Sequence, residues 1–219
     1  RLHSKLVLTG TAVLLVVGTA LFYVVEGDHA FAGVPAGQRL LMAAFQSVTC
    51  RTAGFNTADL MALSQAGVLI SMALMFIGAG SGSTGGGIKV NTFAVLLLGI
   101  RARMLRKDDV NVFRRRLDED TIQQAFSSVS IFGLTCLLGC LVLCVEGVRV
   151  DDALFEAVSA IGTVGLTHGV TPTLKTASKV AITLLMFAGR VGSLSVAMAM
   201  TRDRPQAKVR NVPEKILIG

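Results

Sequence analysis

Two short segments of the sequence repeat the same turn, and their chemistry is that of backbone carbonyls. Thr52-Ala53-Gly54-Phe55 matches Thr163-Val164-Gly165-Leu166, and each copy follows a short apolar segment. Glycine gives the backbone the freedom that inward-pointing carbonyls need. Carbonyls held in this way replace the hydration shell of K⁺ in potassium-selective pores. The candidate carbonyl ligands belong to Cys50, Arg51, Thr52, Ala53 and Gly54 in the first copy, and to Ile161, Gly162, Thr163, Val164 and Gly165 in the second.

The elements that position these turns are predicted to be membrane helices. Of the 219 residues, 52% are hydrophobic and 16% are charged, and the mean hydropathy is +0.65. A helix needs about 20 apolar residues to cross the bilayer core. Four apolar runs approach or reach this length, at residues 6–25, 66–88, 129–145 and 180–189, the last continuing past Arg190 to Met200. We therefore expect an all-α integral membrane protein with four spans.

The first apolar run is too long for a cleavable signal peptide, and no small-residue cleavage site follows it. The chain opens at Arg1 without an initiator methionine, so we expect an upstream portion.

The distribution of charge predicts the topology. The net charge is +7, and the basic residues gather before the first run, between the second and third, and after the fourth. If each run crosses once, all three clusters lie on one side, as the positive-inside rule requires of the cytoplasm. We therefore expect both termini in the cytoplasm, the lipid bilayer as the partner of the apolar surface, and no nucleic acid.

An internal repeat organises the chain. Residues 39–49 and 152–160 are apolar but too short to span, so each is predicted to be a re-entrant helix between two spans. Such a helix points its C-terminal end, which carries partial negative charge, toward the membrane interior, where it favours a cation. Each unit crosses twice, so the two repeats are parallel. We place the repeats at residues 1–105 and 121–201, with a basic linker at 106–120 and a C-terminal tail at 202–219.

A single turn of this kind is ordinarily a glycine that caps a helix in an extracellular loop. Two copies at matched positions favour the carbonyl site instead, because irregular backbone at membrane depth must be shielded by protein or line an aqueous path.

The second span contains a glycine-rich break at residues 78–89, which we interpret as a gate. A phosphate-binding loop is disfavoured, because Ile88 and Val90 flank Lys89 where that motif requires Gly and Ser or Thr. Tight helix packing is the alternative for small residues, but it keeps a four-residue spacing that this run lacks. The candidate gating residues are Gly78, Gly80, Ser81, Gly82, Ser83, Thr84, Gly85, Gly86, Gly87 and Lys89.

Two arginines need separate explanations. Arg190 is the one charge inside the fourth run, and intramembrane charges are functional candidates by default. Its predicted partners are the carbonyls of residues 78–87; the alternative is snorkelling to an interface, from which Arg190 is distant. Arg51 lies inside the first turn and is expected to point away from the cation path, or to pair with an acid in an outer vestibule.

Other potential ligands receive ordinary interpretations. His168 is expected to be a solvated loop residue. Cys136, Cys140 and Cys144 share one face of the third span and are expected to be buried thiols rather than metal ligands. No nucleophile–base pair or paired carboxylates lie at catalytic spacing within the spans, so the sequence does not predict an enzyme.

Three motifs resemble the Trk/Ktr/HKT superfamily of potassium transporters, and are most similar to bacterial Ktr pore subunits. They are Thr-Cys-Arg-Thr-Ala-Gly-Phe-Asn at residues 49–56, Gly-Ser-Gly-Ser-Thr-Gly-Gly-Gly-Ile-Lys at residues 80–89, and Gly-Thr-Val-Gly-Leu at residues 162–166. The ending at residues 213–219 is similar to the C-terminus of Ktr-type subunits. The resemblance implies four helix–pore loop–helix (M1–P–M2) repeats in one polypeptide, of which this chain resembles the third and fourth.

The resemblance also implies roles for individual residues. Gly54 and Gly165 would each supply one strand of a K⁺ filter, residues 78–87 would be an intramembrane gating loop, and Arg190 would be that loop's partner. The implied function is K⁺ uptake across a bacterial plasma membrane, stimulated by Na⁺ in several members, with no organic cofactor. The implied partners are a second copy, giving a homodimer, and a cytosolic nucleotide-binding ring of the KtrA or TrkA type.

One departure leaves an alternative open. Two repeats make half a filter, so this chain alone is not expected to conduct. The turns also lack the Gly-Tyr-Gly of tetrameric K⁺ channels, which leaves K⁺ over Na⁺ selectivity open. The alternative is a non-conducting docking or assembly subunit whose basic segment, residues 101–116, binds anionic lipid or a cytosolic partner. That segment is otherwise explained by the topology signal alone.

Overall fold

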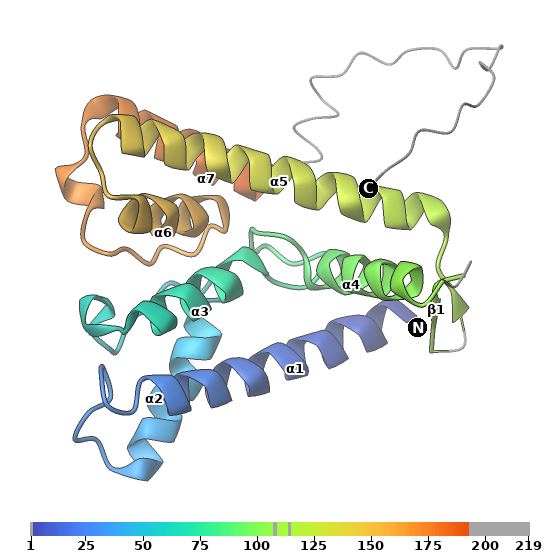
Figure 1. The fold of residues 1–219 in the computed structure, drawn as a ribbon, viewed down its shortest axis with the longest axis horizontal. Coiled ribbons are helices and arrows are strands. Elements are labelled where there is room, and N and C mark those ends of the chain that lie inside the picture. Colours follow the sequence, from blue (N-terminus) through green and yellow to red (C-terminus); the bar gives the residue numbers. More distant parts are fainter. Residues whose placement is uncertain (1, 107–108, 114, 193–219) are drawn as a thin grey trace.

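The computed structural model describes residues 2–106, 109–113 and 115–192 (Figure 1). Within these residues the chain forms seven α-helices, two short 3₁₀ turns (Leu60–Ala62 and Thr171–Thr173) and one small antiparallel hairpin. The helices are α1 (Leu2–Val25), α2 (Ala36–Thr49), α3 (Gln65–Phe76), α4 (Val90–Met104), α5 (Glu119–Val145), α6 (Val150–Ile161) and α7 (Thr176–Val191). The hairpin pairs β1 (Asn111–Val112) with β2 (Arg115–Arg116) inside the basic linker.

Two helices have the length and composition to cross a bilayer by themselves. α1 has 24 residues and α5 has 27, and both carry leucines and valines on exposed faces. The predicted second span, residues 66–88, is helical only to Phe76; the chain becomes helical again at Val90, where α4 begins beyond the predicted end of the span. α7 is described to Val191, and the predicted continuation to Met200 and the tail lie outside the described residues.

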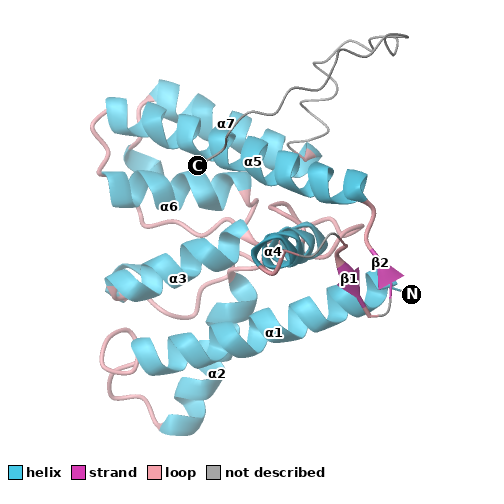
Figure 2. Cartoon of the chain, turned by 45° about the vertical axis from the view of Figure 1, so that its right-hand side comes forward, coloured by secondary structure: helices cyan, strands magenta, loops and turns pink. Residues whose placement is uncertain are grey.

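The two halves of the chain repeat the same arrangement (Figures 1 and 2). In each half a long helix is followed by a short one, α2 or α6, and then by a helix that runs back. α2 packs on α1, whereas α6 packs on α5, α7 and also on α3 of the first half. The fully buried Phe22, Met75, Phe155 and Ile161 belong to one continuous core that joins the halves. This packing brings the C-terminal ends of α2 and α6 into the interior.

Each repeat is tied by an equivalent acid–serine contact, which joins residues too far apart in the sequence to be predicted from it. Glu26 follows α1, is fully buried, and accepts hydrogen bonds from the amide and hydroxyl of Ser64, the residue that caps α3. Glu146 follows α5 and accepts a hydrogen bond from Ser178 in the first turn of α7. The carboxylates therefore connect the first helix of each unit to the start of its last helix.

Replacing Glu26 by alanine is expected to destabilise the protein, because two partly buried donors of Ser64 would lose their acceptor. An unsatisfied buried polar group costs about 1–3 kcal/mol. Thermal unfolding in detergent should show a lower Tm for Glu26→Ala. The matched control is Asp28→Ala, which removes an exposed acid two residues away and should leave Tm unchanged. An unchanged Tm for Glu26→Ala would contradict the assigned contact.

Candidate functional site

Both Thr-x-Gly turns have the same unusual backbone. Thr52 and Gly54 have φ of 71° and 76°, and Thr163 and Gly165 have φ of 52° and 92°. A β-branched residue at positive φ is a conformational outlier. Such strained residues cost about 1–3 kcal/mol each and cluster at functional sites, where the surrounding structure holds them. A threonine with positive φ occurs at matched positions of the two repeats. This backbone shape is therefore a shared feature of both turns.

Equivalent hydrogen bonds hold the two turns in shape. The hydroxyl of Thr49 donates to the carbonyl of Phe55, and the hydroxyl of Ser159 donates to the carbonyl of Leu166 at 2.6 Å. The amide of Ala53 donates to the Thr49 carbonyl at 3.2 Å, and that of Val164 to the Ser159 carbonyl at 2.9 Å. Within the described part of the chain, the carbonyls of Thr52, Ala53, Thr163 and Val164 accept no hydrogen bond. These oxygens therefore remain available to a ligand.

The two turns lie against each other although they are far apart in sequence. A Cβ added at Gly54 would overlap the carbonyl oxygen of Val164 and would lie 3.7 Å from the Cα of Gly165. Thr163, Val164 and Gly165 also line a cavity of about 450 Å³, together with Glu156 on its α6 wall and Arg190 on its α7 wall. Carbonyl oxygens and hydroxyls beside such a cavity are the ligands that hard cations prefer.

The glycine-rich segment between α3 and α4 folds back on itself as a closed loop. The amide of Gly78 donates to the carbonyl of Ile88 at 2.9 Å, and the amide of Ile88 donates to Phe76 at 3.2 Å. Ile77 and Ile88 thereby form an isolated parallel bridge. The residues between them are not helical, so the helix break predicted from the glycines is present in the structure.

The C-terminal part of this loop touches both turns. The amide of Gly86 donates to the hydroxyl of Thr163 at 2.9 Å. A Cβ added at Gly85 would lie 2.7 Å from the hydroxyl of Thr52. The strained threonine of each turn therefore contacts the loop directly, and glycine is required there because larger residues would collide.

Three basic side chains from different elements donate to carbonyls of the loop. Arg51 reaches the carbonyl of Gly78 at 3.3 Å, Lys89 binds that of Gly85, and Arg190 binds that of Thr84. Arg51 has no acid partner among the described residues, so its charge is directed to the loop base instead of an outer vestibule acid. The approach of Arg51 to the loop was not anticipated from the sequence, because the two are 27 residues apart.

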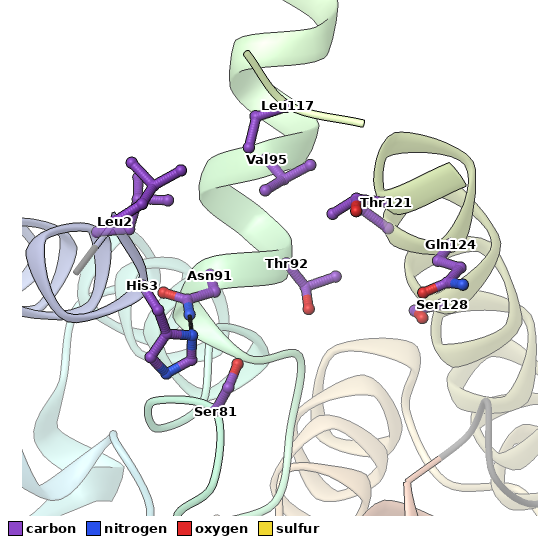
Figure 3. A pocket seen from close by; sticks show the side chains of 12 residues that line it. Leu2, His3, Ser81, Asn91, Thr92, Val95, Leu117, Thr121, Gln124 and Ser128 are labelled. Carbon is purple, nitrogen blue, oxygen red and sulfur yellow. Dashed lines mark hydrogen bonds between the residues drawn. The ribbon is translucent and has the colours of Figure 1, made fainter. Parts of the chain in front are cut away.

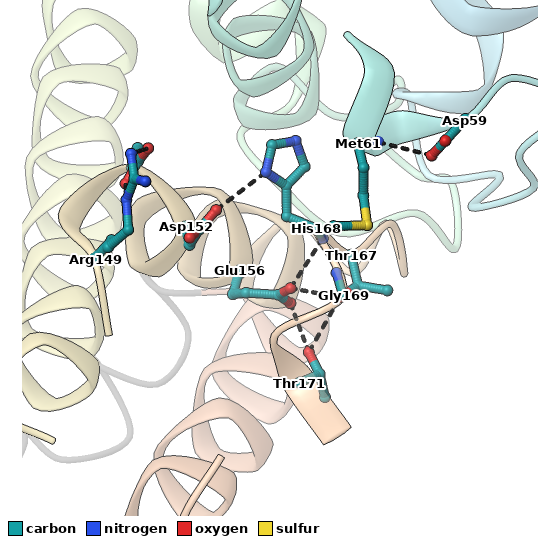
Figure 4. Close-up of polar contacts among 10 residues, drawn as sticks. Asp59, Met61, Arg149, Asp152, Glu156, Thr167, His168, Gly169 and Thr171 are labelled. Carbon is teal, nitrogen blue, oxygen red and sulfur yellow. Dashed lines mark hydrogen bonds and ion pairs between the residues drawn. The ribbon is translucent and has the colours of Figure 1, made fainter. Parts of the chain in front are cut away.

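The expectation for His168 was wrong. Its side chain is only 17% exposed, and its Nδ1 lies 3.1 Å from Asp152 (Figure 4). Its ring stacks on that of Phe155, with 4.5 Å between the ring centroids. The α6 surface shields this loop residue, which local sequence could not reveal.

The cysteine expectation is consistent with the structure: Cys136 and Cys140 are buried and Cys144 is half-buried. In residues 2–106, 109–113 and 115–192, no cluster of His, Cys, Asp and Glu could hold a metal.

A second cavity, lined by both polar and apolar side chains, borders the glycine-rich loop at Ser81 (Figure 3). It has a volume of about 430 Å³ and is lined from α1, α4 and α5. His3 and Asn91 are hydrogen-bonded across its edge at 2.8 Å. None of the turn residues lines it, so this cavity is separate from the site formed by the two turns.

Comparison with known proteins gives a consistent match. Residues 4–212 match the family described as TrkH, cation transport protein. The chain is 39% identical over 209 residues to Ktr system potassium uptake protein B of Vibrio alginolyticus, covering 94% of this chain and 46% of that protein. It is 35% identical over 226 residues to potassium/sodium uptake protein NtpJ of Enterococcus hirae, covering 100% of this chain and 50% of that protein. The chain thus spans about half the length of these relatives.

A solved structure shows the same fold. The potassium transporter TrkH from Vibrio parahaemolyticus superposes with a TM-score of 0.78 at 20% identity, over 89% of this chain and 44% of that one. The predicted fold class is thereby confirmed: the chain is an all-α membrane protein built from parallel repeats of two long helical elements and a short helix with its turn.

Proposed function

Because the chain belongs to the TrkH family of cation transport proteins, we propose that it forms half of a regulated pathway for K⁺ uptake across a bacterial plasma membrane. The family is one of transporters, so the chain is not an enzyme. In this proposal K⁺ is the transported ion, and the carbonyls of residues 50–54 and 161–165 are its ligands. The repeats comprise residues 1–105 and 121–201.

One observation carries this proposal: two turns from separate repeats share the positive φ at Thr and Gly, and they meet. The turn carbonyls that accept no hydrogen bond among the described residues are suited to replace water around a cation. The C-terminal ends of α2 and α6 lead into these turns, and helix C-termini carry partial negative charge that favours a cation. The 35% identical relative is named for both potassium and sodium, so Na⁺ is included as a competing or stimulating ion.

The glycine-rich loop is proposed to be the gate. It touches both threonines of the turns, and Arg51, Lys89 and Arg190 hold its carbonyls. Charge-assisted hydrogen bonds of this kind are stronger than neutral ones, so they favour the closed position of the loop. Moving the loop would break several such bonds together, which is the property of a two-state element.

The remaining components of the proposal concern the assembly. We place both ends of the chain on the cytoplasmic side, from the basic linker at residues 106–120 and the positive-inside rule. A homodimer and a cytosolic nucleotide-binding ring of the KtrA or TrkA type are the proposed partners. The family resemblance supports these partners.

Growth of potassium-uptake-deficient bacteria at low K⁺ tests the function. The chain is expressed joined to the half of the Vibrio alginolyticus relative that it does not match, together with that relative's partner ring. Rescue of growth is expected, and the same fusion with Thr52 and Thr163 both replaced by proline should fail, because proline cannot adopt positive φ. No rescue by a fusion that reaches the membrane would favour the docking-subunit alternative.

A further inference from the structure

A buried carboxylate lies directly behind the second turn. Glu156 is in the middle of α6 and is 4% exposed. Its oxygens accept hydrogen bonds from the hydroxyl of Thr167, from the amide of His168 at 3.1 Å and from the hydroxyl of Thr171 at 2.7 Å (Figure 4). All three donors belong to the loop that continues the second turn. An ionised carboxylate is acceptor-only, so this set of donors matches its charged form.

The charge of Glu156 has no basic partner within the described residues. The ion pairs there join Arg116 to Asp109 and Arg149 to Asp151, and the imidazole of His168 lies 3.1 Å from Asp152. A buried charge without a counter-ion is costly unless hydrogen bonds or a bound ion compensate it. The three hydrogen bonds compensate part of this cost, and a cation nearby would compensate more.

The first repeat carries a neutral residue at the matching position. The sequence Phe45-Gln46 aligns with Phe155-Glu156, and Gln46 is 1% exposed in the last turn of α2. The side-chain amide of Gln46 donates to the Cys50 sulfur at 3.8 Å. Its side-chain oxygen, Oε1, has no hydrogen-bond partner among the described residues. The two repeats therefore share a shape but differ by one buried negative charge.

The position of this charge connects it to the proposed ion ligands. Glu156 and the turn residues Thr163, Val164 and Gly165 line the same cavity of about 450 Å³. Electrostatic interactions in a site shielded from water are several times stronger than in bulk solvent. A cation in this cavity would thus be attracted by the carboxylate, whereas the exposed Asp151 of the same helix acts through water.

We propose that Glu156 is a positioning and specificity-determining residue: its carboxylate holds the loop after the second turn and supplies the charge that draws a cation to residues 163–165. This inference rests on the proposed function. It predicts that removal of the charge weakens ion binding, and that shortening the side chain while keeping the charge disturbs the loop instead.

Initial rates of Rb⁺ uptake by the fusion protein separate these effects. Glu156→Gln, which copies Gln46, is expected to raise the KM for Rb⁺ about tenfold with little change in maximal rate. Glu156→Asp keeps the charge and is expected to retain the native KM while lowering the maximal rate. The control Asp151→Asn removes an exposed acid from the first turn of the same helix, and its KM should change less than about twofold.

Two results would overturn the inference alone while the parent fusion transports normally. One is a native KM in Glu156→Gln. The other is equal loss of maximal rate in Glu156→Gln and Glu156→Asp at unchanged KM, which would assign Glu156 a purely structural role. Failure of the parent fusion to transport Rb⁺ would instead overturn the proposed function, and this inference with it.

Discussion

A Gly54→Ala substitution is expected to abolish potassium uptake, whereas Gly165→Ala should retain part of it. Both glycines have positive φ, which costs an L-residue free energy. Only at Gly54 does the added methyl group also overlap a backbone atom, the carbonyl oxygen of Val164. At Gly165 nothing lies within 4 Å of the added carbon. The backbone of Val164 cannot move aside without displacing the second turn, so the first substitution disturbs both turns.

Uptake of Rb⁺ by the fusion protein measures this difference. The expected loss is more than about a hundredfold for Gly54→Ala, corresponding to roughly 3 kcal/mol, and about tenfold for Gly165→Ala. Gly133→Ala is the matched control, because Gly133 lies inside α5 with open space around it. That substitution should leave uptake unchanged. Equal effects at Gly54 and Gly165 would contradict the contact between the turns.

Deletion of residues 80–86 is expected to raise the rate of uptake about tenfold or more. The deletion removes the carbonyls that Lys89 and Arg190 bind and the amide that binds Thr163. Hydrogen bonds to charged groups contribute about 1.5–3 kcal/mol each, so their loss should shift the loop strongly toward an open pathway. The ends of the deleted segment are close, since a Cβ at Gly87 would lie 3.0 Å from the Cα of Gly78. The shortened loop can therefore close without pulling α3 and α4 together.

Two single substitutions sharpen this test. Arg190→Gln should also raise uptake, but by a smaller factor than the deletion of residues 80–86, because it removes only one of the loop's three basic contacts. Thr84→Ala should have no effect on uptake. Arg190 binds the backbone carbonyl of Thr84, which the substitution keeps, and the Thr84 side chain that is removed is exposed. Unchanged or reduced uptake after the deletion, in a protein that reaches the membrane normally, would show that the loop does not act as a barrier.

The exposed acid–base pair at the N-terminal end of α6 provides an internal reference for these uptake measurements. Arg149 holds the pKa of Asp151 below its usual value by a hydrogen bond of 2.7 Å. This supports its use as the control for Glu156.

Sequence by itself determined the class of protein and the general organisation. Apolar runs of membrane length require lipid, so the helical character of α1 and α5 followed from composition. Six glycines among the ten residues 78–87 predicted the break between α3 and α4, because glycine is a poor helix former. The repeat of Thr-x-Gly-x located both turns. These properties depend on residues that are neighbours in the chain, which is why a linear reading can detect them.

Only the tertiary structure decided which groups meet. The contact of Gly54 with Val164 and the hydrogen bond from Gly86 to Thr163 join residues from different repeats. Arg190 was assigned to the loop from its position in the fourth run, but the particular carbonyl at Thr84 follows from the packing of α7. His168 was misplaced because α6 shields it, and a shielding neighbour leaves no local signal.

The strained Thr52 and Thr163 show most directly what cannot be predicted from the sequence. Threonine disfavours positive φ, so local preference alone predicts an ordinary conformation at Thr52 and Thr163. The surrounding hydrogen bonds, from Thr49 and Ser159 to the far side of each turn, impose the strained shape. Sequence determined where the chain turns, since glycine permits it. The shape of the turn depends on contacts made after the helices have packed, and so it was decided by the tertiary structure.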